Sequence, residues 1–312
     1  MKFSIIGLLS ASLAWSSLSA VSAEGSEAAR EVNSSTCTPT TNNPTFSQEE
    51  LYEMTTNFWS NFIYPKNCAQ SHAINSSLLA ENVQGRIDIT RTFDGVELNT
   101  EYIFGLFCNL QTAASFNVLG TPINFTYTQF LGQGNLVANT VLVYFNLSSI
   151  GLVSPITIQS YINFDSCGRI SQYDAAFKWM DWQFQTVSAA GAALIGTTNT
   201  TAAQDAIASQ LATNICGVAQ EYCTGELQQY DTLEACQSFL TEQIPFGEAW
   251  QLGMNTLVCR DVHVNMVPYR PSVHCPHIGP SGGGYCTNDR SYATFVENSF
   301  FTDEGAMLQI PS

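Results

Sequence analysis

Basic residues are scarce in this chain of 312 residues. Ten lysines and arginines stand against 26 aspartates and glutamates, the formal net charge is −16, and charged residues make up only 12% of the chain, about half of the usual share. A negative field repels phosphate backbones and anionic lipid surfaces, which argues against nucleic acids and membrane surfaces as partners. Disorder is excluded for another reason, since 45% hydrophobic and 12% aromatic residues are enough to build a core. We therefore expect a folded protein with no nucleic-acid partner.

Long apolar runs are absent after the first 23 residues, so no membrane span is expected. The N-terminus has the pattern of a secretory signal. Lys2 precedes an apolar run from Ile5 to Trp15, and Val21-Ser22-Ala23 forms a small-residue cleavage site. The apolar run is too short, and too often interrupted by serine, to be an anchor. We predict a signal peptide at residues 1–23 and a secreted, extracellular protein.

Two further patterns agree with secretion. Five Asn-x-Ser/Thr triplets predict N-glycosylation, at Asn33, Asn75, Asn124, Asn146 and Asn199. The ten cysteines, an even number, predict disulfides in an oxidising compartment. They form a group of four (Cys37, Cys68, Cys108, Cys167) and a group of six (Cys216, Cys223, Cys236, Cys259, Cys275, Cys286). Because each group is even, each part of the chain can be closed by its own disulfides, and the pairing within a group stays open.

Hydrophobic periodicity divides the chain into helical and extended segments. Ser47 and Glu50 form a capping box that starts a helix, and Pro65 ends it. Further helices are expected around Ser71 to Leu79 and from Glu97 to Leu110. Alternating apolar and polar residues predict strands at 86–90, 121–130, 135–147, 154–164 and 169–177. Together these elements predict an α+β fold in which helices pack on a strongly curved antiparallel sheet.

The glycosylation triplets also assign faces to two strands, because a sugar must point to solvent and side chains alternate along a strand. If Asn124 points outward, then Ile123, Phe125 and Tyr127 point inward. The same logic at the next triplet turns a row inward: Val141, Val143, Phe145 and Leu147. A third inward row is expected in the strand that follows: Ile156, Ile158, Ile162 and Phe164.

The order of these elements, with a final hairpin that turns at Gly168-Arg169-Ile170, resembles the SnoaL-like group of the nuclear transport factor 2-like superfamily. The resemblance covers residues 47–185. It implies a cone-shaped barrel whose pocket is closed by helices, a fold shared by cyclases, dehydratases, epoxide hydrolases and inert binding modules. It also implies an inward-facing acid near the last strands that acts as general base, and Asp174 stands in that region.

The resemblance points to other residues of such a pocket. With Asp174 as base, Tyr127 is a candidate hydroxyl donor and His72 a candidate proton carrier, and these three form the predicted catalytic set. The predicted ligand-binding residues are Phe125, Tyr102, Tyr173 and Ile158. Taken singly, each polar candidate also fits an ordinary structural role, as a surface acid, a core tyrosine or a histidine at a helix end.

Three of the four histidines lie in the stretch Cys259–Cys286. As neutral imidazoles, His263, His274 and His277 can face one metal ion, of which zinc and copper are the candidates. Asp261 could add an oxygen ligand. This hypothesis describes a metal site outside the sheet.

The same stretch also has a simpler interpretation. Cys275 and Pro276 lie between His274 and His277, and an extended backbone at the proline would keep the two imidazoles apart. No His-Glu-x-x-His or double Cys-x-x-Cys pattern supports a metal site. The favoured interpretation is therefore a disulfide-rich loop whose histidines satisfy backbone carbonyls. Gly282-Gly283-Gly284 is a flexible turn rather than a phosphate cradle, because no Lys-Ser/Thr follows it.

Composition divides the chain into five parts. These are a signal peptide (1–23), a polar leader (24–46), the α+β barrel (47–185), a linker (186–202) and a Cys-rich helical and loop extension (203–312).

Three functions stay open at this point. The leading hypothesis is that the barrel pocket binds a small apolar molecule and acts on it by acid–base chemistry without a cofactor. The second is a non-catalytic extracellular binding or structural protein, which an inward row of apolar residues without a buried acid would favour. The third is a metal-binding module built from the C-terminal histidines.

Overall fold

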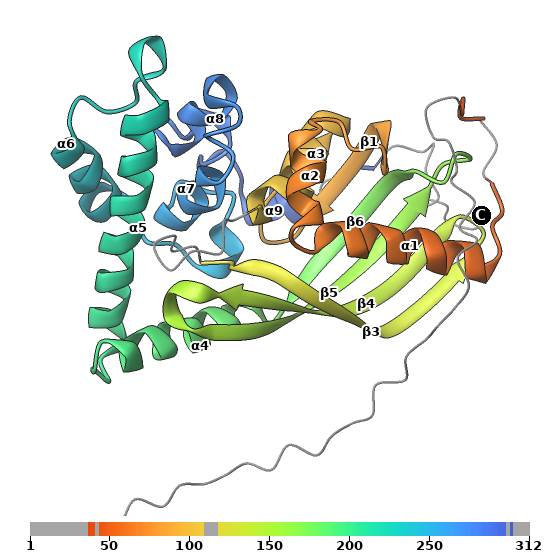
Figure 1. Ribbon diagram of the computed structural model, residues 1–312, viewed down its shortest axis with the longest axis horizontal. Coiled ribbons are helices and arrows are strands. Elements are labelled where there is room, and N and C mark those ends of the chain that lie inside the picture. The colour runs from red at the N-terminus through yellow and green to blue at the C-terminus, as the bar shows by residue number, and fades with distance from the viewer. Residues whose placement is uncertain (1–36, 41–43, 109–117, 298–299, 302–312) are drawn as a thin grey trace, which may run out of the picture. The chain divides into compact units, whose positions relative to one another are not determined.

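A computed structural model describes residues 37–40, 44–108, 118–297 and 300–301, and these residues belong to one compact unit. The predicted signal peptide lies outside the described residues. The strands are β1 (Leu79–Ile87), β2 (Thr92–Asp94), β3 (Thr121–Gln133), β4 (Leu136–Leu147), β5 (Leu152–Phe164) and β6 (Ile170–Lys178). The helices are α1 (Gln48–Phe62), α2 (Lys66–His72), α3 (Val96–Phe104), α4 (Met180–Leu194), α5 (Thr200–Tyr222), α6 (Leu233–Ser238), α7 (Leu257–Val264), α8 (Pro271–Ile278) and α9 (Tyr292–Val296) (Figure 1).

The strands form one six-stranded sheet in the order β2-β1-β6-β5-β4-β3. Strands β3 to β6 run antiparallel, as expected from the hairpin turns between them. Strand β1 pairs with β6 in parallel. The predicted α+β class with helices on a curved sheet is confirmed, and the parallel pair is the one departure from an antiparallel arrangement.

Helix α1 begins where its capping box predicts. The Ser47 hydroxyl accepts a hydrogen bond from the Glu50 N–H at 3.2 Å, and the Glu50 carboxylate accepts one from the Ser47 N–H at 2.8 Å. The helix ends at Phe62, three residues before Pro65. Its buried face packs against β3 and β4 (Figure 1) and consists of Leu51, Thr55, Phe58, Trp59 and Phe62.

The prediction of a helix around residues 71–79 is wrong. Helix α2 ends at His72, and Ile74 has a φ of 66°, which lies outside the right-handed helical region. Leu79 already begins β1 and is paired with Ile170 of β6. Strand pairing with a distant part of the chain therefore outweighed the local helical pattern.

The inward rows of the two central strands are confirmed. Side chains of the β4 row are at most 2% exposed and those of the β5 row at most 3%. The inward orientation of Ile123 is wrong, since this side chain is 38% exposed. The register of β3 shifts between Pro122 and Asn124, and such a shift turns the side chain to the other face. Phe125 and Tyr127 still pack against the core.

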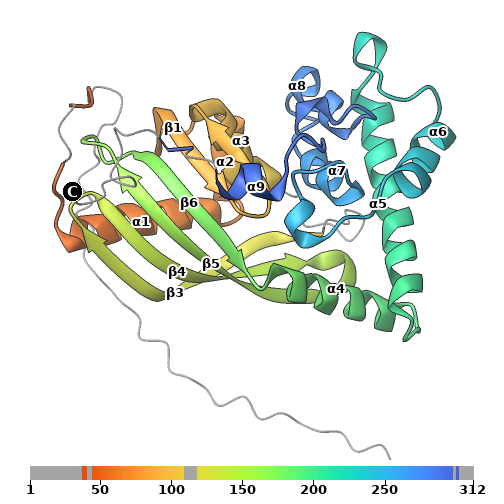
Figure 2. The same cartoon turned by 180° about the vertical axis from the view of Figure 1, so that it is seen from behind.

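Helix α5 organises the C-terminal part of the chain. It packs against α4, α6, α7 and α8 (Figure 2). Its N-terminus is capped by Asn199, whose side-chain oxygen accepts hydrogen bonds from the N–H groups of Thr201 and Ala202. No helix within the described ranges has both the length and the apolar character needed to cross a membrane.

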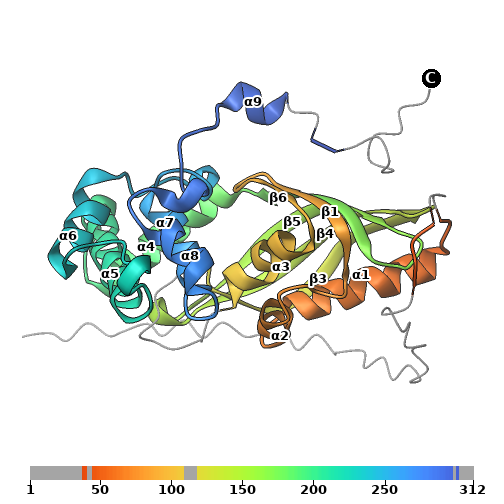
Figure 3. The ribbon, with the colours of Figure 1, turned by 90° about the horizontal axis from the view of Figure 1, so that it is seen from above.

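Each cysteine group pairs within itself, as its even number allows. The pairs are Cys37–Cys167, Cys68–Cys108, Cys216–Cys236, Cys223–Cys275 and Cys259–Cys286. Two of the pairs fasten α7 and α8, the helices that carry the three histidines. Both helices lie close to α3 (Figure 3), and the Asn265 side chain that follows α7 donates to the Leu106 carbonyl just after α3.

Candidate functional site

A small apolar cavity lies between the sheet and helices α1 and α3. Its free volume is about 40 Å³. The lining consists of Phe58, Trp59, Phe62, Ile87, Tyr102, Ile103, Phe107, Ile158, Ser160, Ile162, Ile170, Tyr173, Ala175 and Phe177. Ser160 and the two tyrosines are the polar members of this set, which contains no carboxylate and no imidazole. The wall of the cavity is therefore almost wholly apolar, and it suits apolar groups.

Two of these hydroxyls lack a hydrogen-bond partner in the part of the chain that the structure describes. The Tyr173 hydroxyl and the Ser160 Oγ are buried, and neither has a hydrogen-bond partner among the described residues. Burial raises the pKa of Tyr173 well above its usual value, so the hydroxyl keeps its proton and can donate. Because nearly all buried polar groups are paired, these two hydroxyls are the candidate polar contacts of this cavity.

The structure places three of the four predicted ligand-binding residues in this lining. They are Tyr102, Tyr173 and Ile158. Phe125 lies on β3 outside the lining, with its ring 6.4 Å from that of Trp59.

The prediction that Asp174 faces the pocket is wrong. Its neighbours Tyr173 and Ala175 line the cavity, and alternation along β6 therefore turns Asp174 to the opposite face. There it forms an ion pair with Arg86, and both side chains are about a quarter exposed. A carboxylate in this position cannot reach a molecule in the cavity.

The other two predicted catalytic residues also lie outside the cavity lining. His72 is exposed at the end of α2, and its ring stacks on Tyr269 with centroids 4.1 Å apart. The Tyr127 hydroxyl is 3.3 Å from the Thr56 Oγ1. The structure does not bring Asp174, Tyr127 and His72 together.

The three C-terminal histidines, in contrast, converge. One ring nitrogen of each of His263, His274 and His277 lies within 4.8 Å of those of the other two, and all three side chains are buried. The Nδ1 atoms of His274 and His277 are 3.2 Å apart. The expected separation of these two residues at Pro276 is wrong, because helix α8 continues through the proline and places residues three apart on one face.

Helix α3 supplies the outer partners of the cluster. Glu101 Oε1 is 3.2 Å from His274 Nε2 and is also bonded by Arg270. The Tyr102 hydroxyl is 3.2 Å from His263 Nε2. Since the ring of Tyr102 lines the cavity, this tyrosine joins the cavity to the histidines.

Burial sets the charge of this cluster. It lowers the pKa of His263 far below the usual value, helped by the neighbouring His277 and His274, and it lowers the pKa of His277 to about 3. Burial works against ionisation of Glu101, but interactions with His274 and Arg270 hold the pKa of this carboxyl below its usual value. The imidazoles of His263 and His277 are therefore neutral, and the carboxylate of Glu101 is ionised.

Tyr285 covers the cluster from the loop after α8. Its ring centroid is 4.5 Å from that of His277 and 5.5 Å from that of Tyr102. Arg91 stacks over Tyr285 and donates to the carbonyl of Gly284 at 2.8 Å.

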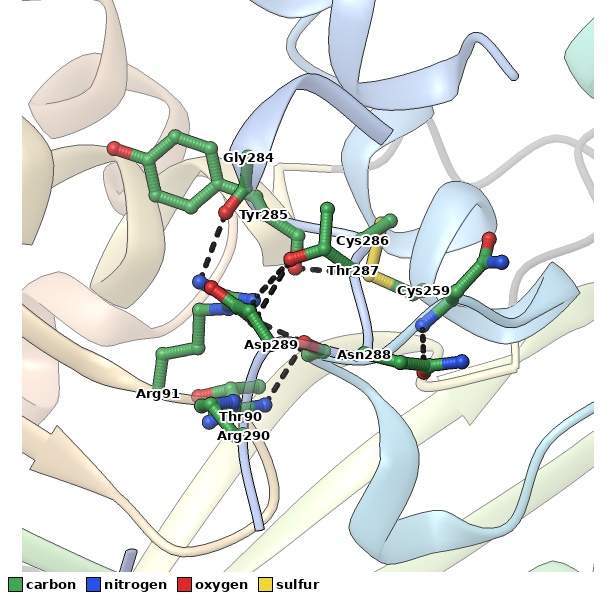
Figure 4. Close-up of polar contacts among 12 residues, drawn as sticks. Thr90, Arg91, Cys259, Gly284, Tyr285, Cys286, Thr287, Asn288, Asp289 and Arg290 are labelled. Atoms are coloured by element: carbon green, nitrogen blue, oxygen red, sulfur yellow. Dashed lines mark hydrogen bonds and ion pairs between the residues drawn. A yellow bond between two sulfur atoms is a disulfide. The ribbon is translucent and has the colours of Figure 1, made fainter. Parts of the chain in front are cut away.

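The same loop is fastened to the β1–β2 turn by a polar network (Figure 4). Arg91 donates to Thr287 and forms an ion pair with Asp289, in each case at 2.8 Å. Arg290 donates to the Thr90 carbonyl in the opposite direction. These contacts hold Tyr285 in place over the imidazoles.

Sequence reasoning missed Glu101 and Tyr285 as members of this site. The sequence offered one signal for Glu101, because this acid stands among the apolar residues of the helix. Asp261, the expected oxygen ligand, is buried but accepts a hydrogen bond from the Val118 N–H at 3.0 Å. It is not among the groups that converge with the histidines.

A wider hollow of about 310 Å³ lies at the surface beside α5 and α6. Its lining includes the Cys216–Cys236 disulfide and Asp231, but it gathers no cluster of buried ionisable groups. We therefore place the candidate site at the cavity and the histidine cluster.

Comparison with known proteins covers both parts of the chain. Residues 56–175 match the BfoA N-terminal domain, and residues 179–289 match the BfoA family C-terminal domain. The aurasperone B biosynthesis cluster protein A of Aspergillus niger is 47% identical over 271 residues, which span 86% of this chain and 87% of the relative. The bifonsecin B biosynthesis cluster protein A of Aspergillus brasiliensis has the same identity over the same length, and 89% of it is covered.

Structural neighbours include the SnoaL-like group that the sequence resembles. A SnoaL-like polyketide cyclase from Jannaschia covers 46% of this chain and 91% of its own, at 8% identity and a TM-score of 0.33. An LEH-like epoxide hydrolase from M. tuberculosis covers 48% of this chain and 98% of its own, at 10% identity and a TM-score of 0.35.

Proposed function

Because the chain belongs to the BfoA family, whose relatives in two aspergilli are biosynthesis cluster proteins, we propose that it binds a small, largely apolar, oxygen-bearing polyketide intermediate or product in the sheet cavity. One observation carries the proposal, namely an apolar cavity whose lining residues Tyr173 and Ser160 have buried hydroxyls without a hydrogen-bond partner among the described residues. An oxygen on the ligand would accept or donate the hydrogen bonds that these groups lack.

The lining favours binding over acid–base catalysis by the sheet. A general base or acid must lie within hydrogen-bond reach of the reacting atom, and the lining residues include no carboxylate or imidazole. The acid predicted for that role, Asp174, lies on the other face. We therefore favour a cavity that binds polyketide-type ligands without catalysing a reaction on them.

The size of the cavity sets a condition on the ligand. Typical small-molecule pockets hold about 300–1,000 Å³, and the free volume here is about 40 Å³. An aromatic ligand must therefore displace lining side chains as it binds. Three of the aromatic lining residues, Phe58, Trp59 and Phe62, come from α1, so a shift of this helix would widen the cavity.

We expect Ala175→Leu to weaken binding of 1-naphthol, an aromatic probe with one hydroxyl. The larger side chain fills the cavity, so the affinity measured by titration calorimetry should fall at least about 10-fold, since each lost 1.4 kcal/mol is tenfold. Ala176→Leu is the matched control, because Ala176 is the next residue on β6 and faces away from the cavity. Equal affinity in Ala175→Leu and wild type would rule out the cavity as the binding site.

Tyr173→Phe separates the polar contact from the apolar one. The loss of one hydrogen bond should weaken 1-naphthol binding about 5- to 10-fold, which corresponds to about 1 kcal/mol. Naphthalene, which has no hydroxyl, should bind both proteins equally. A uniform loss for the two probes would show that Tyr173 acts only by its shape.

We also propose that the protein is secreted and N-glycosylated. Five disulfides join all ten cysteines, which fits an oxidising compartment. Asn75, Asn124 and Asn199 are exposed, whereas Asn146 is half-buried. Mass spectrometry of protein recovered from the culture medium should find an N-terminus near Glu24, no free thiol and sugars on the exposed sites. Recovery from the cell interior with reduced cysteines would contradict this proposal.

A further inference from the structure

The histidine cluster has the spacing of a metal site. In a tetrahedral zinc site with Zn–N bonds of about 2.0–2.1 Å, neighbouring ligand nitrogens lie about 3.3–3.4 Å apart. The Nδ1 atoms of His274 and His277 are 3.2 Å apart, close to such an edge. The third imidazole, His263, has its ligand nitrogen within 4.8 Å of both.

Hydrogen bonds from helix α3 select which nitrogen of His274 and of His263 is left to bind. An ionised Glu101 accepts from His274 Nε2–H, which leaves the Nδ1 lone pair of His274 facing His277. A metal-bound imidazole commonly uses its second N–H in this way, with a carboxylate as acceptor. The Tyr102 hydroxyl forms the corresponding hydrogen bond with the Nε2 of His263.

His263 supplies an independent observation. Its side chain is 1% exposed, and its Nδ1 has no hydrogen-bond partner among the described residues. An unpaired ring nitrogen in a buried site is costly unless something binds it. A cluster held only by hydrogen bonds between protein groups would leave this atom unexplained.

We propose that His263, His274 and His277 bind one divalent transition-metal ion, and zinc is the ion used to test the site. Glu101 and Tyr102 are positioning residues that orient two of the imidazoles from helix α3. Three neutral nitrogen ligands and no thiolate suit zinc or copper. Cys259 and Cys286 lie near His263 but are joined to each other, so they are not ligands.

The surrounding structure keeps these ligands in place. Cys275, which lies between two of the ligands, is bonded to Cys223 of the loop after α5, and Cys259, one turn before His263, is bonded to Cys286. Three protein ligands leave the fourth tetrahedral position for water or another small molecule. Tyr285 packs over the cluster and limits access to that position.

Titration of chelator-treated, untagged protein with Zn²⁺ tests this inference. Calorimetry should show one site per chain in wild type, and Co²⁺ should give the intense visible absorption of a tetrahedral complex. His274→Ala and His277→Ala should each weaken zinc binding at least about 100-fold, and Glu101→Gln should weaken it about 10- to 100-fold. His72→Ala is the matched control, because His72 is the remaining histidine and is exposed.

Two results of these titrations would contradict the metal site. Absence of stoichiometric zinc binding in folded wild type, or equal binding by wild type and His277→Ala, would overturn the metal site. Circular dichroism of each variant shows whether it is folded. If the alanine variant at His277 is unfolded, His277→Gln takes its place. Binding of 1-naphthol is measured apart from zinc, so failure of one proposal does not decide the other.

Discussion

Replacing Arg260 with methionine is expected to lower the free energy of unfolding by about 3–5 kcal/mol. Arg260 is fully buried and donates to the carbonyls of Thr256, Gly279 and Pro280 and to the side chain of Asn255. Methionine fills a similar volume but donates no hydrogen bond, and so each of these acceptors would lose the hydrogen bond from Arg260 in the interior. Urea denaturation followed by circular dichroism measures the change.

The matched control is Arg86→Met on the sheet. Arg86 makes one ion pair, with Asp174, and both partners are about a quarter exposed. We expect this variant to cost less than about 1 kcal/mol. If Arg260→Met were as mild as Arg86→Met, the buried guanidinium would not be the group that joins α7 to the turn after α8.

Gly85→Ala is expected to destabilise the protein by about 3 kcal/mol. Gly85 lies on β1 opposite Tyr173 of β6, and a Cβ at this position would overlap the ring of Tyr173. The ring is buried, so it can move only by disturbing the cavity lining. The same variant should therefore also weaken 1-naphthol binding.

A double-mutant cycle tests this explanation. If the clash with Tyr173 is the cause, Gly85→Ala combined with Tyr173→Leu should cost about 1–3 kcal/mol less than the sum of the two single changes. Gly217→Ala in α5 is the control, because nothing lies within 4 Å of a Cβ there. A helical alanine should stabilise the protein by up to about 1 kcal/mol. Strict additivity in the cycle would show that Gly85 is required for another reason.

Much of the sheet could be predicted from the sequence, because alternation and glycosylation triplets both report on the same faces. The inward rows of β4 and β5 follow from this pattern alone. The beginning of β1 could not be found in this way, since Leu79 is held by pairing with Ile170, far away in the chain. The register shift at Pro122 likewise leaves no signal in the alternation.

The candidate site was harder to predict than the fold. A shift of one residue decides which face a strand side chain takes, and this is why Asp174 lies outside the cavity while Tyr173 lies within it. The three histidines were identified as candidate ligands, but the local argument from Pro276 pointed the wrong way. Glu101 joins them only because α3 packs beside α7 and α8, a contact that no short stretch of sequence encodes.

One measurement tests most directly whether the histidine cluster binds a metal ion. Crystals of the zinc-loaded protein should show, in anomalous diffraction at the zinc edge, one strong peak about 2.0–2.1 Å from ring nitrogens of His263, His274 and His277. A peak only at surface residues, or none, with His274 and His277 still bonded to each other, would contradict the site. The cluster would then be a buried hydrogen-bonded contact between helices.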